Sequence, residues 1–188
     1  MQFCADLADK FNNGGGSMFL LKYDGRRFSK SSKMLSVGAL AGLAGGLAEI
    51  LWIALYSNLS GSEAAIVARG VTQSLFPQIT TLSSSLSLGI AIHMALAIIL
   101  GIAILIFVRS FLPKTAPAML EPLMVIGLLA LVWVINFFVI LPVVNPSFVT
   151  LVPYSISLIS KLLFGISSAL IFTLFNQQSR SKNRVEKK

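Results

Sequence analysis

Four long apolar runs dominate the pattern of hydrophobic and polar positions along the chain. They cover about 35–57, 86–108, 121–144 and 154–176, and polar segments separate them. Each run has about 23 residues, and a helix of that length at about 1.5 Å per residue crosses a hydrocarbon core of about 30 Å. The pattern predicts an all-α polytopic membrane protein. Its transmembrane domain, 34–176, is a bundle of four transmembrane helices, with tails at 1–33 and 177–188.

Composition supports the same class of protein. The chain is 55% hydrophobic and 12% charged, with a formal net charge of +8, whereas soluble domains average about 45–50% apolar and about 25% charged residues. A strongly basic chain can indicate nucleic-acid binding, but the basic residues here lie almost wholly in the two tails and one short loop. Membrane proteins distribute positive charge in this way, so the expected partner is the lipid bilayer and not nucleic acid.

The asymmetry of the loops predicts an orientation. The tails 1–33 and 177–188 and the loop 109–120 are basic, the loop 58–85 carries one acid and one base, and the loop 145–153 carries no charge. The positive-inside rule therefore predicts that both termini are cytoplasmic. A polar leader precedes the first apolar run, so we expect the first span to serve as an uncleaved insertion signal in a plasma membrane, by this pattern a bacterial inner membrane.

The N-terminal tail has the composition of a flexible basic segment. It contains the run Asn12-Asn13-Gly14-Gly15-Gly16-Ser17 followed by several lysines and arginines. Met18 and Met34 are alternative start positions. Cys4 is the single cysteine, which precludes an intramolecular disulfide.

Two of the connecting segments carry their own signals. Ser62 is placed to cap a short amphipathic helix within 58–85, which we expect to lie at the outer membrane interface, although it could instead form a lid over a cavity. The segment 142–154 contains three prolines, so we expect a stiff, extended outer turn there.

The four spans each place one strongly polar residue at a similar depth. Each of these residues lies about seven or eight positions from the expected outer end of its span, which corresponds to roughly 10–12 Å below the outer boundary. The four residues are Glu49, His93, Asn136 and Lys161. A shared depth on four helices predicts a single intramembrane polar cluster.

Small residues continue from three of these polar positions at helical spacing. Such stripes are where membrane helices approach each other closely, so the polar groups on them should face protein and not lipid. The helix-packing glycines are Gly38, Gly42 and Gly45 with Glu49, Gly89 and Gly101 with His93, and Gly165 with Lys161. No such stripe supports Asn136.

An acid and an amine at equal depth in a low-dielectric bundle should pair. We therefore predict a Glu49–Lys161 ion pair, with His93 and Asn136 hydrogen-bonded to it. The cluster could simply fix the order of the helices, or it could be a protonatable site open towards the outer face. Glu49 and His93 are only two candidate ligands, which is too few for a closed tetrahedral metal site, and a single histidine cannot supply bis-histidine haem ligation. No metal or cofactor is therefore expected.

Two classes of function remain open. The first, slightly favoured, is a non-catalytic subunit or assembly factor of a larger membrane complex. The alternative is a proton-linked transporter or permease, as a homo-oligomer, in which Glu49 is the protonatable residue and Lys161 and His93 tune it. The chain carries no nucleophile or phosphate-binding motif, so an enzyme is not expected.

Overall fold

The computed structural model describes residues 25–79, 84–113 and 115–185. It divides into two units, Met1–Ser32 and Lys33–Lys188. Within the first unit the described residues form the start of a helix. The predicted linker at 12–17 lies outside the described residues. All four apolar runs belong to the second unit.

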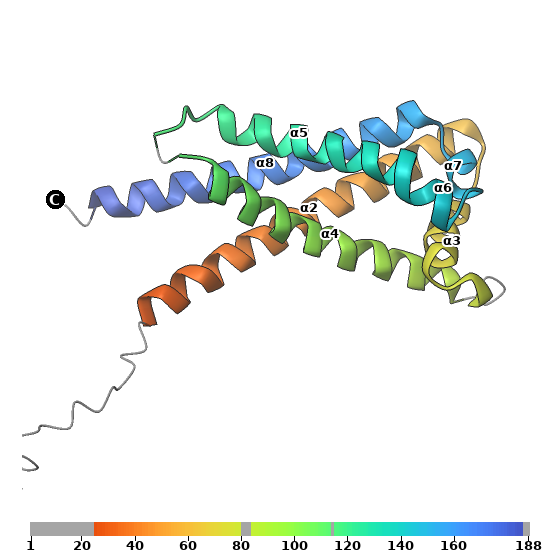
Figure 1. Cartoon of the computed structure of the whole chain (residues 1–188), viewed down its shortest axis with the longest axis horizontal. Helices are drawn as coiled ribbons and strands as arrows, with labels where there is room; N and C mark the ends of the chain where they lie inside the picture. Colours follow the sequence, from red (N-terminus) through yellow and green to blue (C-terminus); the bar gives the residue numbers. More distant parts are fainter. Residues whose placement is uncertain (1–24, 80–83, 114, 186–188) are drawn as a thin grey trace, which may run out of the picture. The chain divides into compact units, whose positions relative to one another are not determined.

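The described residues form helices joined by turns and short loops, and they contain no strand. Four helices are long and apolar enough to cross a membrane, with spans at Ser32–Ser60, Ser85–Phe111, Leu120–Val144 and Tyr154–Gln177. The elements are α2 (Gly25–Ser60), α3 (Ala64–Leu75), the 3-10 turn η1 (Pro77–Ile79), α4 (Ser85–Phe111), α5 (Leu120–Ile135), the π-helical turn η2 (Asn136–Ile140), α6 (Leu141–Val144), α7 (Phe148–Leu151) and α8 (Tyr154–Val185) (Figure 1).

The four predicted spans are present, and their ends differ from the predicted ends by a few residues. The larger difference is that two helices continue beyond their apolar runs. The helix α2 begins at Gly25 and α8 continues to Val185. Neither extension contains a proline or an interior glycine, and lysine and arginine are good helix formers, so the backbone has no reason to break at the apolar boundary.

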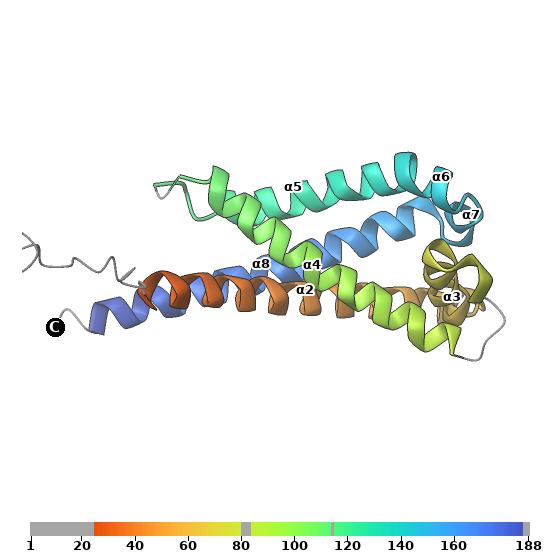
Figure 2. The same cartoon turned by 60° about the horizontal axis from the view of Figure 1, so that its bottom comes forward.

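Close contacts made by small residues hold the first two spans together, and α2 crosses α4 in Figure 2. A methyl group added at Gly42 would lie 2.8 Å from the Cα of Ile98 and closer still to the Ala97 carbonyl oxygen. One at Gly101 would lie 2.6 Å from the Cα of Gly42. Glycine at these positions lets the two backbones touch, as is typical of small-residue stripes in membrane helices.

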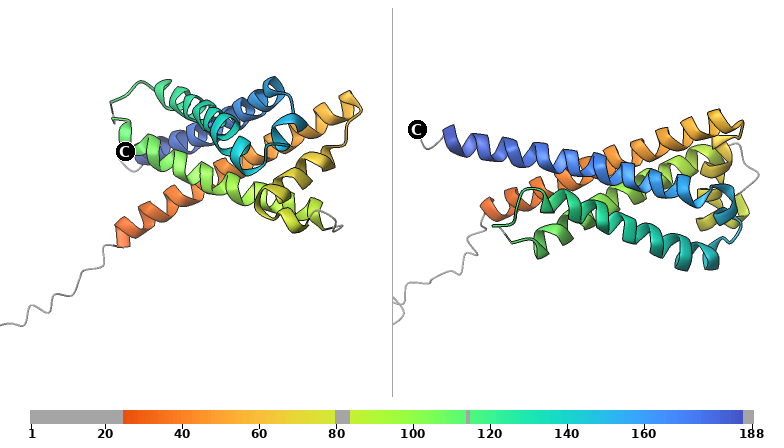
Figure 3. Two further views of the ribbon diagram at one scale, coloured as in Figure 1. Left: turned by 45° about the vertical axis from the view of Figure 1, so that its right-hand side comes forward. Right: turned by 90° about the horizontal axis from the view of Figure 1, so that it is seen from above.

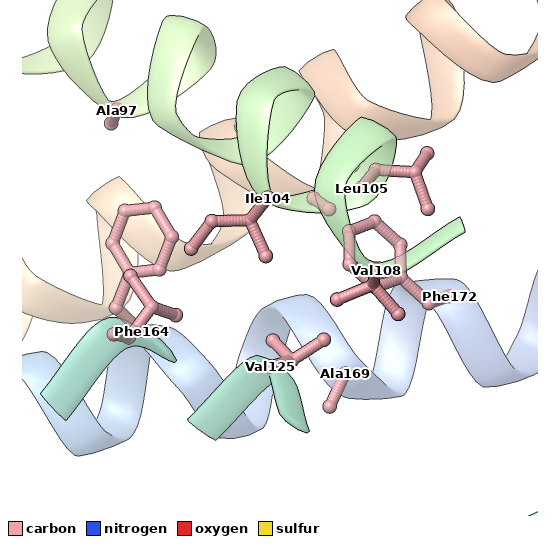
Figure 4. Close-up of a cluster of buried hydrophobic side chains, with 10 residues drawn as sticks. Ala97, Ile104, Leu105, Val108, Val125, Phe164, Ala169 and Phe172 are labelled. Carbon is pink, nitrogen blue, oxygen red and sulfur yellow. The ribbon is translucent and has the colours of Figure 1, made fainter. Parts of the chain in front are cut away.

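A hydrophobic core begins at this crossing and joins the spans. Side chains from α4, α5 and α8 meet there, among them Val108, Val125, Phe164 and Phe172, which are each no more than 1% exposed (Figure 4). Ser168 of α8 donates a hydrogen bond of 3.0 Å to the Ala41 carbonyl of α2 within the same region. This part of the bundle is apolar and tightly packed.

The short helices gather at one end of the bundle, which we call the α3 end (Figure 1, Figure 3). The helix α3 packs along the start of α4, where Gly89 lies directly beneath the Ala68 carbonyl and Thr72 donates a 2.7 Å hydrogen bond to the Ser85 carbonyl. Asn145 then ties α3 to the segment before α7 through its Nδ2, which donates to the Ser74 hydroxyl at 3.1 Å. The predicted short helix is therefore a packed element.

Two details of these connections were predicted wrongly. The residue that caps α3 is Glu63, without a side-chain hydrogen bond, and the Ser62 hydroxyl instead lies 2.9 Å from that of Ser60. The segment 142–154 is not extended, because it contains most of α6 and all of α7. Pro142 lies in the first turn of α6, which follows η2 without a break, so its missing N–H leaves this span one helical hydrogen bond short.

Candidate functional site

Three of the four polar residues predicted from depth meet in space. Glu49 on α2 lies between Lys161 on α8 and His93 on α4. The Lys161 Nζ is 2.7 Å from the Glu49 Oε1, and the His93 Nε2 is 3.5 Å from the Glu49 Oε2. The two carboxylate oxygens therefore face different helices, and the ion pair predicted from the sequence is present.

The cluster is most deeply buried at its acid. Glu49 is 5% exposed, whereas the side chains of Lys161 and His93 are 17% and 28% exposed. Taking a carboxylate out of water costs several kcal/mol, and only a close counter-charge with good geometry offsets this cost. The 2.7 Å contact with Lys161 supplies that counter-charge.

Glycines bring the three helices close enough for these contacts. A methyl group at Gly45 would lie 2.6 Å from the Phe164 ring of α8, and one at Gly46 would lie 2.8 Å from the Ala97 Cβ of α4. Both positions are about one turn from Glu49 on α2. The Phe164 ring also lies beneath Lys161, with the Nζ 5.3 Å from the ring centre, within range of a cation–π attraction.

Some polar atoms of the cluster have hydrogen-bond partners and others have none. The Ser160 hydroxyl donates a long hydrogen bond of 3.4 Å to the Glu49 Oε1, the oxygen that Lys161 already holds. The Glu49 Oε2 and the His93 Nε2 are buried and make no hydrogen bond with any described residue. These two atoms attract each other across 3.5 Å but leave their hydrogen-bonding capacity unused.

Asn136 does not join the cluster: within the described ranges, no hydrogen bond or ion pair links its side chain to the other three residues. It opens the π-helical turn η2, in which the Leu141 N–H donates to the Asn136 carbonyl five residues earlier. Pro142 has no N–H to offer the carbonyl four residues before it, which favours such a wider turn. The turn changes the rotation of this span relative to a regular helix.

Sequence reasoning missed two features of the polar network. Ser160 adjoins Lys161, but a serine in an apolar run carries no signal of its own. At the end of the bundle opposite α3, the Arg109 Nη2 lies 3.0 Å from the Glu121 Oε1. The Asn176 Nδ2 donates a 2.8 Å hydrogen bond to the Glu121 Oε2. Arg109 also donates to the Asn176 side-chain oxygen, so α4, α5 and α8 are tied together there.

In the polar cluster an imidazole and an ammonium group lie on the two sides of a carboxylate, and each of these groups can in principle gain or lose a proton. Among the residues that the structure describes, no three His, Cys, Asp or Glu side chains are grouped to hold a metal ion.

In comparisons with known proteins, no protein-family model, curated protein or solved structure matches the chain.

Proposed function

We propose that this protein is a proton-linked transporter or permease of the plasma membrane, in which Glu49 is the residue that gains and loses the proton. The observation that carries the proposal is the gap of 3.5 Å between the Glu49 Oε2 and the His93 Nε2, two buried atoms without a hydrogen bond. A network that served only to hold helices together would be expected to satisfy its buried polar atoms, because each unsatisfied one costs about 1–3 kcal/mol.

A proton entering this gap changes the charge on which the helix contacts depend. A proton on His93 gives Glu49 a second cation to bind, and its transfer to the Oε2 leaves a neutral carboxyl group and a neutral imidazole. A neutral Glu49 no longer holds the Lys161 ammonium by charge. Proton binding would in this way loosen α2 from α8, and that movement is what we propose to be linked to passage of a solute.

The packing glycines support this choice over the subunit function that the sequence slightly favours. That function needs small-residue faces free for a partner. The contact between α2 and α4 already covers Gly38, Gly42 and Gly101. The contact between α2 and α8 covers Gly45. Gly89 receives α3, and Gly165 faces α5.

Transport can be tested in vesicles that contain a pH-sensitive dye. Solutes from a panel of amino acids, organic cations, sugars and carboxylates are added outside, one at a time. We expect at least one class to drive proton movement, and we expect Glu49→Gln to abolish it. Glu121→Gln is the matched control, because it makes the same chemical change at the other ion pair. Proton movement that survives Glu49→Gln would contradict the proposal.

A non-catalytic subunit or assembly factor is the second candidate, and one glycine favours it. Gly127 lies on an exposed face of α5, where an added methyl group would meet no atom within 4 Å. Its exposed neighbours Leu123 and Leu131 could pack against a helix of another copy or another protein. Native mass spectrometry after mild extraction tests this, because a stoichiometric partner that Gly127→Leu displaces would favour the subunit function.

We further propose that both termini face the cytoplasm of a bacterial cell and that the α3 end faces outward. The charge asymmetry supports this orientation, since Arg109 and Lys114 lie in the loop at the opposite end. A fluorescent protein fused after Lys188 should fold and fluoresce, whereas a phosphatase that needs an oxidising compartment should be active only when inserted near Pro146.

A further inference from the structure

A second candidate site lies apart from the polar cluster, at the α3 end of the bundle. A cavity of about 210 Å³ opens between the end of α2, the start of α3 and the segment that includes α7. Each water molecule takes up about 30 Å³ of liquid, so the cavity has room for several waters or for one small organic molecule. Its size is below that of drug-sized pockets, which begin at about 300 Å³.

The lining of this cavity combines one acid with an apolar wall. Ile66 of α3 and Leu151 of α7 supply aliphatic surface, Tyr56 supplies an aromatic ring, and Ser57 and Thr150 supply hydroxyl groups. Glu63 is the charged residue of the lining; it is an exposed residue, and it forms no ion pair with the residues that the structure describes. An aromatic ring and a carboxylate on one small apolar cavity are the groups that bind a cation with a hydrocarbon body.

The cavity follows the same face of α2 as the polar cluster. Glu49, Ile53 and Ser57 recur at a spacing of four residues, so they lie above one another on the helix. Ser57 is about 12 Å from Glu49 along the axis, at about 1.5 Å per residue. Ile53 lines the cavity and lies between it and the acid.

We infer that this cavity is a binding site for a small organic cation, an amine that carries an apolar group, with Glu63 as its counter-charge. Binding here does not require Glu49 to change its protonation state. Binding of a cation at this site is therefore a property separate from the proposed transport, and either one can be present without the other.

Protection of an engineered cysteine tests the site directly. Cys4→Ser removes the natural thiol, and Ser57→Cys then places a nearly isosteric thiol on a residue that lines the cavity and is 3% exposed. The purified protein is treated with N-ethylmaleimide, which is neutral, in the presence of benzylammonium, benzyl alcohol or benzoate. These three ligands share a shape and differ in charge.

Benzylammonium alone should slow the modification. With a dissociation constant of about 1 mM, about 10 mM ligand should slow it about tenfold. Glu63→Gln in the same background should remove the difference between the three ligands. Asn58→Cys is the matched control, since it is the next residue on α2, exposed and outside the cavity, and its modification should not respond to any of them.

Each other result overturns the inference. Equal protection by all three ligands would indicate an apolar pocket without charge selection, and no protection would indicate no site. A thiol at 57 that never reacts would show that the cavity is closed. If Ser57→Cys does not run as a single species on size exclusion, Val152→Cys replaces it, at a lining residue that is 4% exposed, with the same expected pattern.

Discussion

Glu49 and Lys161 form an ion pair of 2.7 Å between the first and the last span, with the acid 5% exposed. Their contact joins α2 to α8, and the burial of the Glu49 carboxylate limits how far water can screen the attraction. The pair therefore has two properties that are in tension. It holds two distant parts of the chain together, and it makes that hold depend on a group that a single proton can neutralise.

Lys161→Met should destabilise the protein strongly, because it leaves the Glu49 carboxylate buried without its cation. Breaking a buried pair from one side costs about 3–5 kcal/mol. The measurement is the free energy of unfolding in mixed detergent micelles. Adding Glu49→Gln to Lys161→Met should recover most of the loss, since a neutral amide replaces the stranded charge. A double variant as unstable as the single one would show that packing, and not charge, is responsible.

Arg109→Gln should have a much smaller effect on the same free energy. The Arg109 side chain is 42% exposed, and Glu121 keeps its 2.8 Å hydrogen bond from Asn176 when the arginine is removed. Exposed ion pairs contribute about 0.2–1 kcal/mol. The difference between wild type and Arg109→Gln should also shrink as salt is added, whereas the effect of Lys161→Met should not. Equal salt sensitivity of the two variants would contradict this.

Gly42→Ala should force the first two spans apart. The added methyl group would meet the backbone of Ala97 and Ile98, which cannot move aside as a flexible side chain could. Overpacking of this kind costs about 1–3 kcal/mol. Gly127→Ala is the matched control on an open face, where nothing lies within 4 Å, and it should leave the free energy of unfolding unchanged or slightly higher.

The sequence was most informative where one physical constraint acts on many residues. The spans were predictable because hydrocarbon tolerates only long apolar helices. The meeting of Glu49, His93 and Lys161 was predictable because depth and a small-residue stripe together limit where a polar group can point. Their role in transport stays a prediction.

The predictions that were wrong or missing concern the local geometry of the backbone and contacts between individual side chains. Asn136 has the expected position in its span, but a π-helical turn begins there, and depth alone does not give rotation. Arg109 could equally have reached lipid headgroups, so its contact with Glu121 gave no signal in advance. The prolines predicted an extended turn over 142–154, but α6 and α7 each form a single helical turn there.

Asn145→Ala should loosen the α3 end without unfolding the spans. The Asn145 Nδ2 donates to the Gly70 carbonyl at 3.3 Å and to the Ser74 hydroxyl at 3.1 Å, and both acceptors belong to α3. The Asn145 Oδ1 also accepts hydrogen bonds from the Ser147 hydroxyl and the Phe148 N–H, so the substitution should cost at least about 1 kcal/mol, and the loss should fall on α3 and α7. Amide hydrogen exchange should become faster in α3 and stay the same in α5. Asn58→Ala, on the exposed end of α2, should change neither.

His93→Gln should separate the role of the cluster in stability from its role in proton movement. The His93 Nε2 makes no hydrogen bond with the described residues, so its loss should change the free energy of unfolding by less than about 1 kcal/mol. Glutamine cannot carry a proton, however, and histidine is the side chain that ordinarily titrates between about pH 5 and 8. Under the proposed function, the pH dependence of solute-driven proton movement should therefore become flatter. Ser160→Ala removes another contact of Glu49 without removing a titrating group, and it should keep the shape of the profile. A wild-type profile in His93→Gln would show that the imidazole is not on the proton's route.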